Sequence, residues 1–223
     1  MSAGLNVEPL NADHRDAENI NAENIKRYFG EKLETYGPTP RGADWNSEDA
    51  QQRRFAQLVK VLDPQQAFTV IDYGCGYGGL VDYLLEQGYR FQYTGYDLLE
   101  AMVIQAGEIH AQKPVACTFT SALDGLQPAD YTLASGIFNI KFEATGEAWT
   151  KESLRTLHQM DRLSKRGFAF NMLTSYSDPE YMRPHLYYAN PGFMFDYCKR
   201  HFSRNVALLH DYDLYDFTIL VRK

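Results

Sequence analysis

The chain has 223 residues, of which 44% are hydrophobic, so it can bury one sizeable core. Its formal net charge of −7 argues against a nucleic-acid partner, because nucleic-acid binders usually carry a basic surplus or stripe. Its three separated cysteines, without a C-x-x-C pair, favour neither a disulfide framework nor a zinc site. No apolar run approaches the ~20 residues that span a bilayer, so we expect a cytoplasmic protein without membrane attachment.

The first part of the chain is expected to form a leader and two helices. Residues 1–16 offer few apolar anchors, which is typical of a mobile leader. Apolar side chains then recur at helical spacing up to Tyr36, where Gly37-Pro38 ends the helix. A second helix begins near Ser47 and ends before Pro64. We expect residues 17–65 to form a helical extension.

This extension also carries candidate ligand contacts. Its aromatic residues would either provide walls for a ligand or bury one face of each helix; they are Tyr28, Phe29, Tyr36 and Trp45. Arg53 or Arg54 could meet a carboxylate or phosphate, although solvated arginines are the favoured interpretation.

From residue 66 onward, short β-rich runs alternate with helical patterns. The expected strands are 68–73, 91–96, 115–120, 131–135, 167–173, 206–210 and 215–221. Among the helices, Thr150 is expected to cap one, and Asn190 with Pro191 to open the last. This alternation implies a mainly parallel seven-stranded sheet with helices on both faces. The last two strands are joined by a short link that permits only an antiparallel hairpin, so the C-terminal strand is expected to be reversed.

A glycine-rich turn follows the first of these strands and reads Asp72-Tyr73-Gly74-Cys75-Gly76-Tyr77-Gly78-Gly79. Glycines allow a tight reversal and let a ligand approach the backbone, while the next helix offers free N–H groups. Asp97 ends the second strand, where a carboxylate can accept hydrogen bonds from both hydroxyls of a ribose. The string also satisfies the dinucleotide fingerprint G-x-G-x-x-G, so an NAD(P)-dependent oxidoreductase is an alternative.

The D-x-G-x-G-x-G pattern from Asp72, the acidic Asp97 and the reversed terminal hairpin together resemble the class I S-adenosylmethionine (SAM)-dependent methyltransferases. The resemblance covers roughly residues 68–223. It implies a Rossmann-like α/β fold, in which residues 66–223 form the SAM-binding domain. It also implies SAM as cofactor, methyl transfer to an oxygen or nitrogen of a small-molecule acceptor, and closure of the helical extension over the ligands. No Asp/Glu/His cluster shows ligand-like spacing, so we expect no metal. A non-catalytic SAM-binding subunit is a second alternative.

Carried over position by position, the resemblance predicts cofactor contacts at Asp72, Gly74, Cys75, Gly76, Asp97, Leu98, Ser121, Ser135 and Gly136. The family often has an acidic residue where Ser121 follows the third strand. The fourth strand lacks the Asn/Asp-Pro-Pro-aromatic signature of enzymes that methylate base amino groups, which argues against such an acceptor.

A hydroxyl or ammonium acceptor needs a base to take its proton. His210, at the end of the sixth strand, is the first candidate, because histidine is the side chain best suited to accept a proton near neutral pH. A structural histidine bonded to the neighbouring turn is an equally good interpretation. Asn139, after the fourth strand, is a second catalytic candidate. The expected substrate contacts lie near the same strand ends and in the long link after the fifth strand; they are Phe138, Tyr187, Tyr188 and Tyr212.

Overall fold

The computed structural model describes residues 12–45 and 47–223, with side chains from residue 22 onward. Residues 1–11 of the predicted leader, which comprises residues 1–16, lie outside the described part of the chain. Helix α1 (Ala12–Tyr36) begins within the last residues of that predicted segment. None of the described helices is long and apolar enough to cross a membrane.

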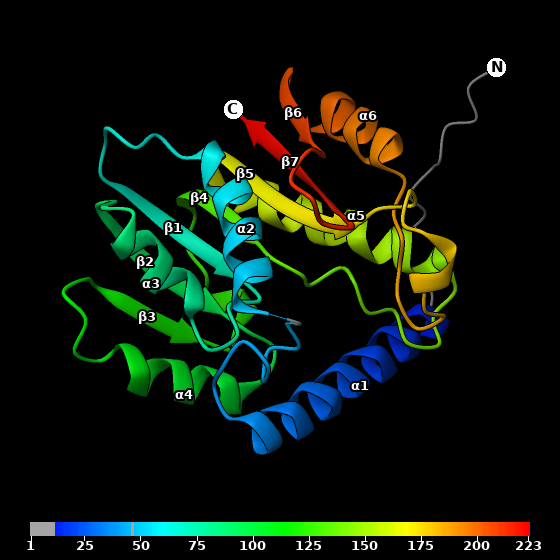
Figure 1. Cartoon of the computed structure of the whole chain (residues 1–223), viewed down its shortest axis with the longest axis horizontal. Helices are drawn as coiled ribbons and strands as arrows, with labels where there is room; N and C mark the ends of the chain where they lie inside the picture. Colours follow the sequence, from blue (N-terminus) through cyan, green and yellow to red (C-terminus); the bar gives the residue numbers. More distant parts are fainter. Residues whose placement is uncertain (1–11, 46) are drawn as a thin grey trace.

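A seven-stranded sheet forms the centre of the described chain, in the order β3-β2-β1-β4-β5-β7-β6 (Figure 1). Its strands are β1 (Phe68–Tyr73), β2 (Phe91–Tyr96), β3 (Cys117–Thr120), β4 (Ala129–Ala134), β5 (Ser164–Leu173), β6 (Asn205–Leu209) and β7 (Asp216–Arg222). Strands β1 to β5 pair in parallel, whereas β7 runs antiparallel to both β5 and β6. The predicted Rossmann-like sheet with a reversed C-terminal strand is therefore confirmed.

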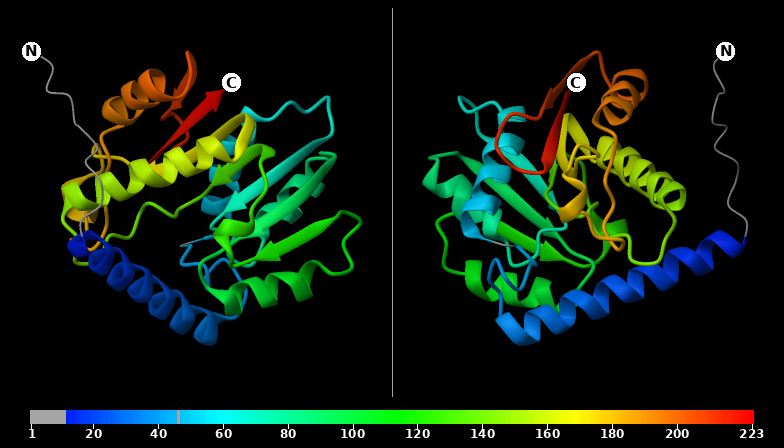
Figure 2. Two further views of the ribbon diagram at one scale, coloured as in Figure 1. Left: turned by 180° about the vertical axis from the view of Figure 1, so that it is seen from behind. Right: turned by 45° about the vertical axis from the view of Figure 1, so that its right-hand side comes forward.

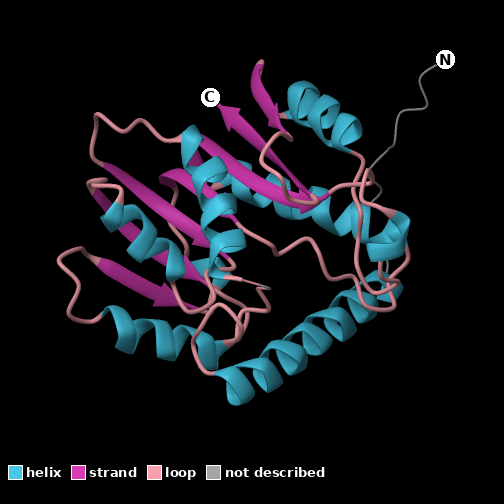
Figure 3. Ribbon diagram, in the orientation of Figure 1, coloured by secondary structure: helices cyan, strands magenta, loops and turns pink. Residues whose placement is uncertain are grey.

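Helices cover both faces of this sheet (Figure 3). They are α2 (Glu48–Leu58), α3 (Gly79–Glu86), α4 (Glu100–His110), α5 (Gly146–Arg162) and α6 (Pro191–His201). One core packs α2 and α3 against one face, and a second core packs α5 and α6 against the other. Successive side chains of β5 point to opposite faces of the sheet, which explains this division. Phe168 and Phe170 belong to the second core, and Ala169 belongs to the first.

The predicted helix starts at Ser47 and Asn190 agree with the structure, whereas the one at Thr150 does not. Ser47 accepts a hydrogen bond from the Ala50 N–H as the N-cap of α2, and Asn190 does the same for α6. The predicted cap at Thr150 is wrong, because α5 begins a turn earlier at the cap Thr145. Thr150 lies inside the helix and donates its hydroxyl to the Gly146 carbonyl.

The register of β1 and β2 places the glycine turn beside the end of β2. Asp72 pairs with Gly95 and Tyr73 with Tyr96, so Gly74 leaves β1 at the level where Asp97 leaves β2. Helix α1 runs along the side of the molecule toward which the arrows of β1, β2 and β3 point (Figures 1 and 2). A cavity at these strand ends therefore has α1 as one of its walls.

A buried ion pair joins α2 to the first residue of β7. The Arg54 Nη2 lies 2.5 Å from the Asp216 Oδ2, and the two residues are 9% and 1% exposed. The guanidinium also donates to the Ala50 carbonyl and lies 4.8 Å from the centre of the Trp45 ring. The prediction that Arg54 is solvated is thus wrong, because packing of α2 on the sheet buries it. Arg53 has a half-exposed side chain and pairs with Asp49.

Removing one member of this pair should leave a buried charge without its partner. Asp216→Ala is expected to lower the free energy of unfolding by about 3–5 kcal/mol in urea titration. The double variant Arg54→Met/Asp216→Leu should lose less, because an apolar pair avoids the unpaired charge. Arg53→Ala is the control, since its exposed pair contributes less than about 1 kcal/mol. A double variant as unstable as Asp216→Ala would contradict this account.

Candidate functional site

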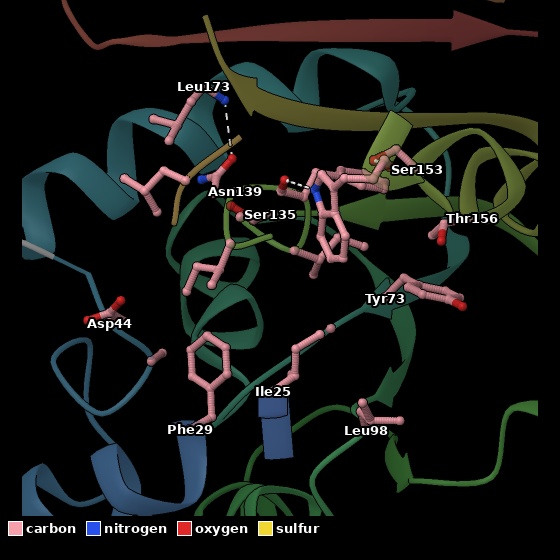
Figure 4. Close-up of a pocket in the computed structure, with 18 of the residues that line it drawn as sticks. Ile25, Phe29, Asp44, Tyr73, Leu98, Ser135, Asn139, Ser153, Thr156 and Leu173 are labelled. Atoms are coloured by element: carbon pink, nitrogen blue, oxygen red, sulfur yellow. Dashed lines mark hydrogen bonds between the residues drawn. The ribbon is translucent and has the colours of Figure 1, made fainter. Parts of the chain in front are cut away.

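A cavity of about 1220 Å³ lies at the carboxyl ends of the parallel strands (Figure 4). Its walls come from α1, the following loop to Trp45, the glycine turn, the end of β2, the segment after β4, α5 and the long segment after β5. This volume exceeds the ~300–1,000 Å³ of common small-ligand pockets. The cavity therefore has room for a cofactor and a second molecule.

The glycine turn is attached to the end of β2 by backbone hydrogen bonds. The N–H groups of Gly74 and Cys75 both donate to the Tyr96 carbonyl, at 2.7 and 2.9 Å. Gly74 has φ +83°, and a Cβ there would lie 2.2 Å from the Ile137 Cγ2. Gly76 also has a positive φ of +53°. Glycine at position 74 thus satisfies a left-handed backbone and leaves room for the segment after β4.

Asp97 closes the same turn from the other side. Its Oδ2 accepts the Gly76 N–H at 2.9 Å, and its Oδ1 accepts the Leu99 N–H at 2.9 Å. Burial raises the pKa of this carboxyl, while the two N–H donors oppose that effect. A carboxylate offers about four acceptor sites, so Asp97 keeps capacity for a ligand's hydroxyl groups while it holds the turn.

Asp72 lies beneath the turn and is 4% exposed. Its Oδ2 accepts a hydrogen bond from the Tyr93 hydroxyl at 2.7 Å. Burial, and to a smaller extent the nearby Asp97, raise the pKa of Asp72 to about 7. Since Asp72 also lines the cavity, it can present a negative charge to a cationic ligand group at neutral pH or above.

The segment after β4 is fixed from β5 by Asn171, a residue that sequence reasoning missed. The fully buried Asn171 accepts the Gly136 N–H at 2.8 Å and donates to the Ser135 hydroxyl at 3.1 Å. In return, the Asn139 side-chain oxygen accepts the Leu173 N–H at 3.2 Å. One feature of the sequence could have indicated this role: Asn171 is the one polar side chain in the otherwise apolar run 167–173. Asn139 lines the cavity, but its oxygen is already engaged in holding this segment.

Gly136 is where the N-terminal extension meets the site. It has φ +79°, and a Cβ there would lie 2.7 Å from the Trp45 ring. Of the other three predicted wall residues, Phe29 lines the cavity, whereas Tyr28 and Tyr36 do not, and Tyr36 is 44% exposed. Asp44, just before Trp45, accepts hydrogen bonds from Tyr28 and Lys32 of α1, both at 2.7 Å. These contacts fix the loop after α1 over the segment after β4.

Most predicted cofactor contacts meet in this one cavity. Its lining includes Asp72, Gly74, Cys75, Gly76, Asp97, Leu98, Ser135 and Gly136, and the predicted substrate contacts Phe138 and Tyr188. Ser121 is exposed and does not line the cavity, whereas Leu123, two residues later, does.

Other predicted residues lie elsewhere. His210 is exposed at the end of β6, beside the Tyr176 and Phe217 rings, and does not line the cavity. Tyr212 is buried and hydrogen-bonds with Thr218 instead. The physical reason is the sheet order, since β7 and β5 separate β6 from β4.

The long segment after β5 contributes residues that were not predicted. Backbone bonds from Lys141 to His185 and from Tyr187 to Asn139, both 2.9 Å, attach it to the segment after β4. His185 consequently lines the cavity. Tyr187 points elsewhere, because its hydroxyl lies 2.6 Å from the Thr150 hydroxyl on α5. Pairing between two irregular segments has no sequence signature, so these positions required the structure.

Solved structures share this fold at low sequence identity. A magnesium protoporphyrin IX methyltransferase from Synechocystis PCC 6803 with bound S-adenosylhomocysteine (SAH) matches with a TM-score of 0.64 and 16% identity, over 91% of this chain and 100% of that one. A 1,6-didemethyltoxoflavin-N1-methyltransferase from Burkholderia thailandensis matches with a TM-score of 0.60 and 20% identity, over 97% and 92%. Both matches show the class I methyltransferase fold.

A closer relative in sequence is a Mycobacterium tuberculosis protein named "Putative methyltransferase Rv1506c". It is 46% identical over 167 residues, which cover 75% of this chain and 98% of the relative. The chain belongs to the class I SAM-dependent methyltransferase family. No family model matches the chain. In this methyltransferase the family's glycine turn and acidic residue line one cavity, and the reversed hairpin completes the sheet beside β5.

Ionisation of the buried Asp72 should make this methyltransferase less stable as the pH rises. Its pKa is about 7 in the folded chain against about 3.9 in the unfolded chain, so the folded state binds the proton more tightly. The resulting stabilisation is complete below about pH 4 and is lost as the pH rises through about 7.

Asp72→Asn removes this titration. The free energy of unfolding of the native protein, relative to Asp72→Asn, should therefore fall by up to about 4 kcal/mol between pH 4 and pH 8. Urea titrations across this range measure the difference. Parallel stability curves for the two proteins would show that Asp72 does not titrate in this way.

Proposed function

We propose that the chain binds SAM in this cavity and transfers its methyl group to an oxygen or nitrogen of a small-molecule acceptor. The observation that carries the proposal is the junction of the glycine turn with Asp97 at the ends of β1 and β2. The backbone there faces a cavity that has room for both molecules. Family membership supports the same chemistry.

The residues of the cavity fit the parts of SAM. Asp97 would accept hydrogen bonds from the ribose hydroxyls, and Leu98 would pack against the adenine. The close approach that Gly74 and Gly76 allow would admit the methionine part, with Asp72 facing its ammonium group. Of the predicted contacts, Ser121 has no place in this arrangement because it lies outside the cavity.

SAM supplies a methyl group on a sulfonium, which is a good leaving group, so the protein contributes mainly orientation. Holding two reactants in line can supply ~7–11 kcal/mol of the barrier. Ser135 and Gly136 would face the methyl group, with Phe138 and Asn139 beside the acceptor. Asn171 keeps this segment in place through two hydrogen bonds, which makes it a positioning residue for transfer.

The helical extension, residues 17–65, would act as a lid over the bound molecules. Trp45 lies over Gly136 and against Arg54, and Phe29 reaches the cavity from α1. Closure of this kind excludes water from the reacting centre. Residues 66–223 would then form the SAM-binding domain.

Binding of the reaction product tests the cofactor assignment. SAH should bind in isothermal titration, and Asp97→Ala should weaken its binding by about 1–3 kcal/mol, since charge-assisted hydrogen bonds are lost. Asp196→Ala, on α6 and outside the cavity lining, is the matched control and should bind SAH normally. Equal SAH affinity in a folded Asp97→Ala variant would remove the ribose assignment. Binding of NAD or NADP in place of SAH would overturn the function.

Hydrogen exchange tests the lid. SAH should slow backbone amide exchange in residues 37–45, because the bound molecule would hold the lid closed. Trp45→Ala should reduce this protection. Tyr36→Ala, a change at an exposed ring, should retain it. Unchanged exchange in residues 37–45 when SAH is bound would mean that the extension does not respond to the cofactor.

A further inference from the structure

The cavity has two parts with different chemistry. One part is formed by the glycine turn, Asp72 and Asp97, and is rich in backbone and carboxylate groups. The second lies between α1, the segment after β4 and the start of α5, and we call it the α1 chamber. Its apolar lining comprises Ala22, Ile25, Phe29, Ile137, Phe138, Ala144, Ala148, Trp149 and Leu173.

Helix α1 presents one apolar face to this chamber. Ile25 and Phe29 are four residues apart, so they lie on one side of the helix and rise toward Ser135 and Asn139 (Figure 4). Lys26, Arg27 and Glu31 are exposed. Both apolar side chains remain partly accessible although they line a cavity.

Several polar side chains on the walls of the α1 chamber have partners within the chain, and the charged residues of α5 that line the cavity pair as Glu147 with Lys151 and Glu152 with Arg155. The Trp149 Nε1 donates to the Phe138 carbonyl at 2.7 Å, and Ser153 donates to the Trp149 carbonyl at 2.8 Å. The Asn139 oxygen accepts the Leu173 N–H. The apolar surface of the chamber comes mainly from α1 and the segment after β4, through Ile25, Phe29 and Ile137. A ligand body with many polar groups would lose its hydrogen bonds to water there and gain few in return.

The α1 chamber also adjoins the place of methyl transfer. Ile137 packs against Gly74 of the glycine turn on one side, and the same residue belongs to the apolar wall of the chamber. A molecule in the chamber would thus lie beside the cofactor instead of replacing it. Arg183 and His185, which are exposed, also line the cavity and would meet a polar end of this molecule.

We propose that the methyl acceptor has an apolar body that lies in the α1 chamber against Ile25, Phe29 and Ile137, with its reactive oxygen or nitrogen at Ser135–Asn139. This inference rests on the proposed SAM-dependent function and adds the class of acceptor. Burial of apolar surface is the main source of affinity in this part of the cavity. The helical extension then contributes to substrate selection as well as to closure.

The neutral apolar fluorophore N-phenyl-1-naphthylamine can probe the α1 chamber directly. Its fluorescence should rise on binding to the full chain, both without SAH and with saturating SAH, because the two molecules occupy different parts of the cavity. Ile25→Asn and Phe29→Ser should each weaken fluorophore binding by roughly tenfold, since an apolar contact is lost and a polar group is introduced. Both variants should keep their SAH affinity, which also shows that they are folded.

Ile104→Asn is the matched control, because Ile104 is 54% exposed on α4 and does not line the cavity. It should bind the fluorophore as the native protein does. Displacement of the fluorophore by SAH would assign the α1 chamber to the cofactor and overturn the proposal. Unchanged fluorophore affinity in Ile25→Asn and Phe29→Ser would overturn it as well. Failure of SAH to bind the native protein would instead refute the SAM-dependent function itself.

Discussion

The attachment of the glycine turn to the end of β2 is the constraint on which the rest of the site depends. Two N–H groups of the turn share the Tyr96 carbonyl, and the Asp97 carboxylate accepts the Gly76 N–H. These bonds hold the backbone in a left-handed conformation that few residues other than glycine adopt easily. The missing side chain at Gly74 also makes room for Ile137, so the ends of β1, β2 and β4 can surround one cavity.

The opposite wall of the cavity is held by contacts between distant parts of the chain. Asp216 at the start of β7 pairs with Arg54, the Arg54 guanidinium lies against Trp45, and the Trp45 ring lies over Gly136. These side-chain contacts thus connect the reversed strand β7 to the helical extension. Because the Arg54–Asp216 pair is buried, it depends on its geometry far more than an exposed pair would, and breaking it would loosen the packing of α2 on the sheet.

The carboxylates of the cavity are largely committed to structure. Asp97 holds the turn, Asp72 accepts from Tyr93, and Asp44 accepts from Tyr28 and Lys32. Methyl transfer from a sulfonium to a positioned acceptor depends mostly on orientation, so such commitments are compatible with the chemistry. The cavity therefore contributes order on the cofactor side and apolar surface on the side of α1.

Local patterns in the sequence were enough to predict the α/β sheet, its reversed last strand and the glycine turn that lines the cavity. These patterns are local: they are the alternation of hydrophobic residues, the glycine-rich motif around Gly74 and the position of Asp97 at the end of a strand. A local pattern can be recognised without knowing which distant segments pack against it. Which distant residues complete the cavity became apparent from the three-dimensional arrangement of the strands and loops. His210 ends the edge strand β6 and stays outside, whereas Asn171, Trp45 and His185 come to the site through strand order and pairing of irregular segments. Such contacts depend on packing between segments that are far apart in the chain. A periodicity or motif within one segment therefore does not predict them.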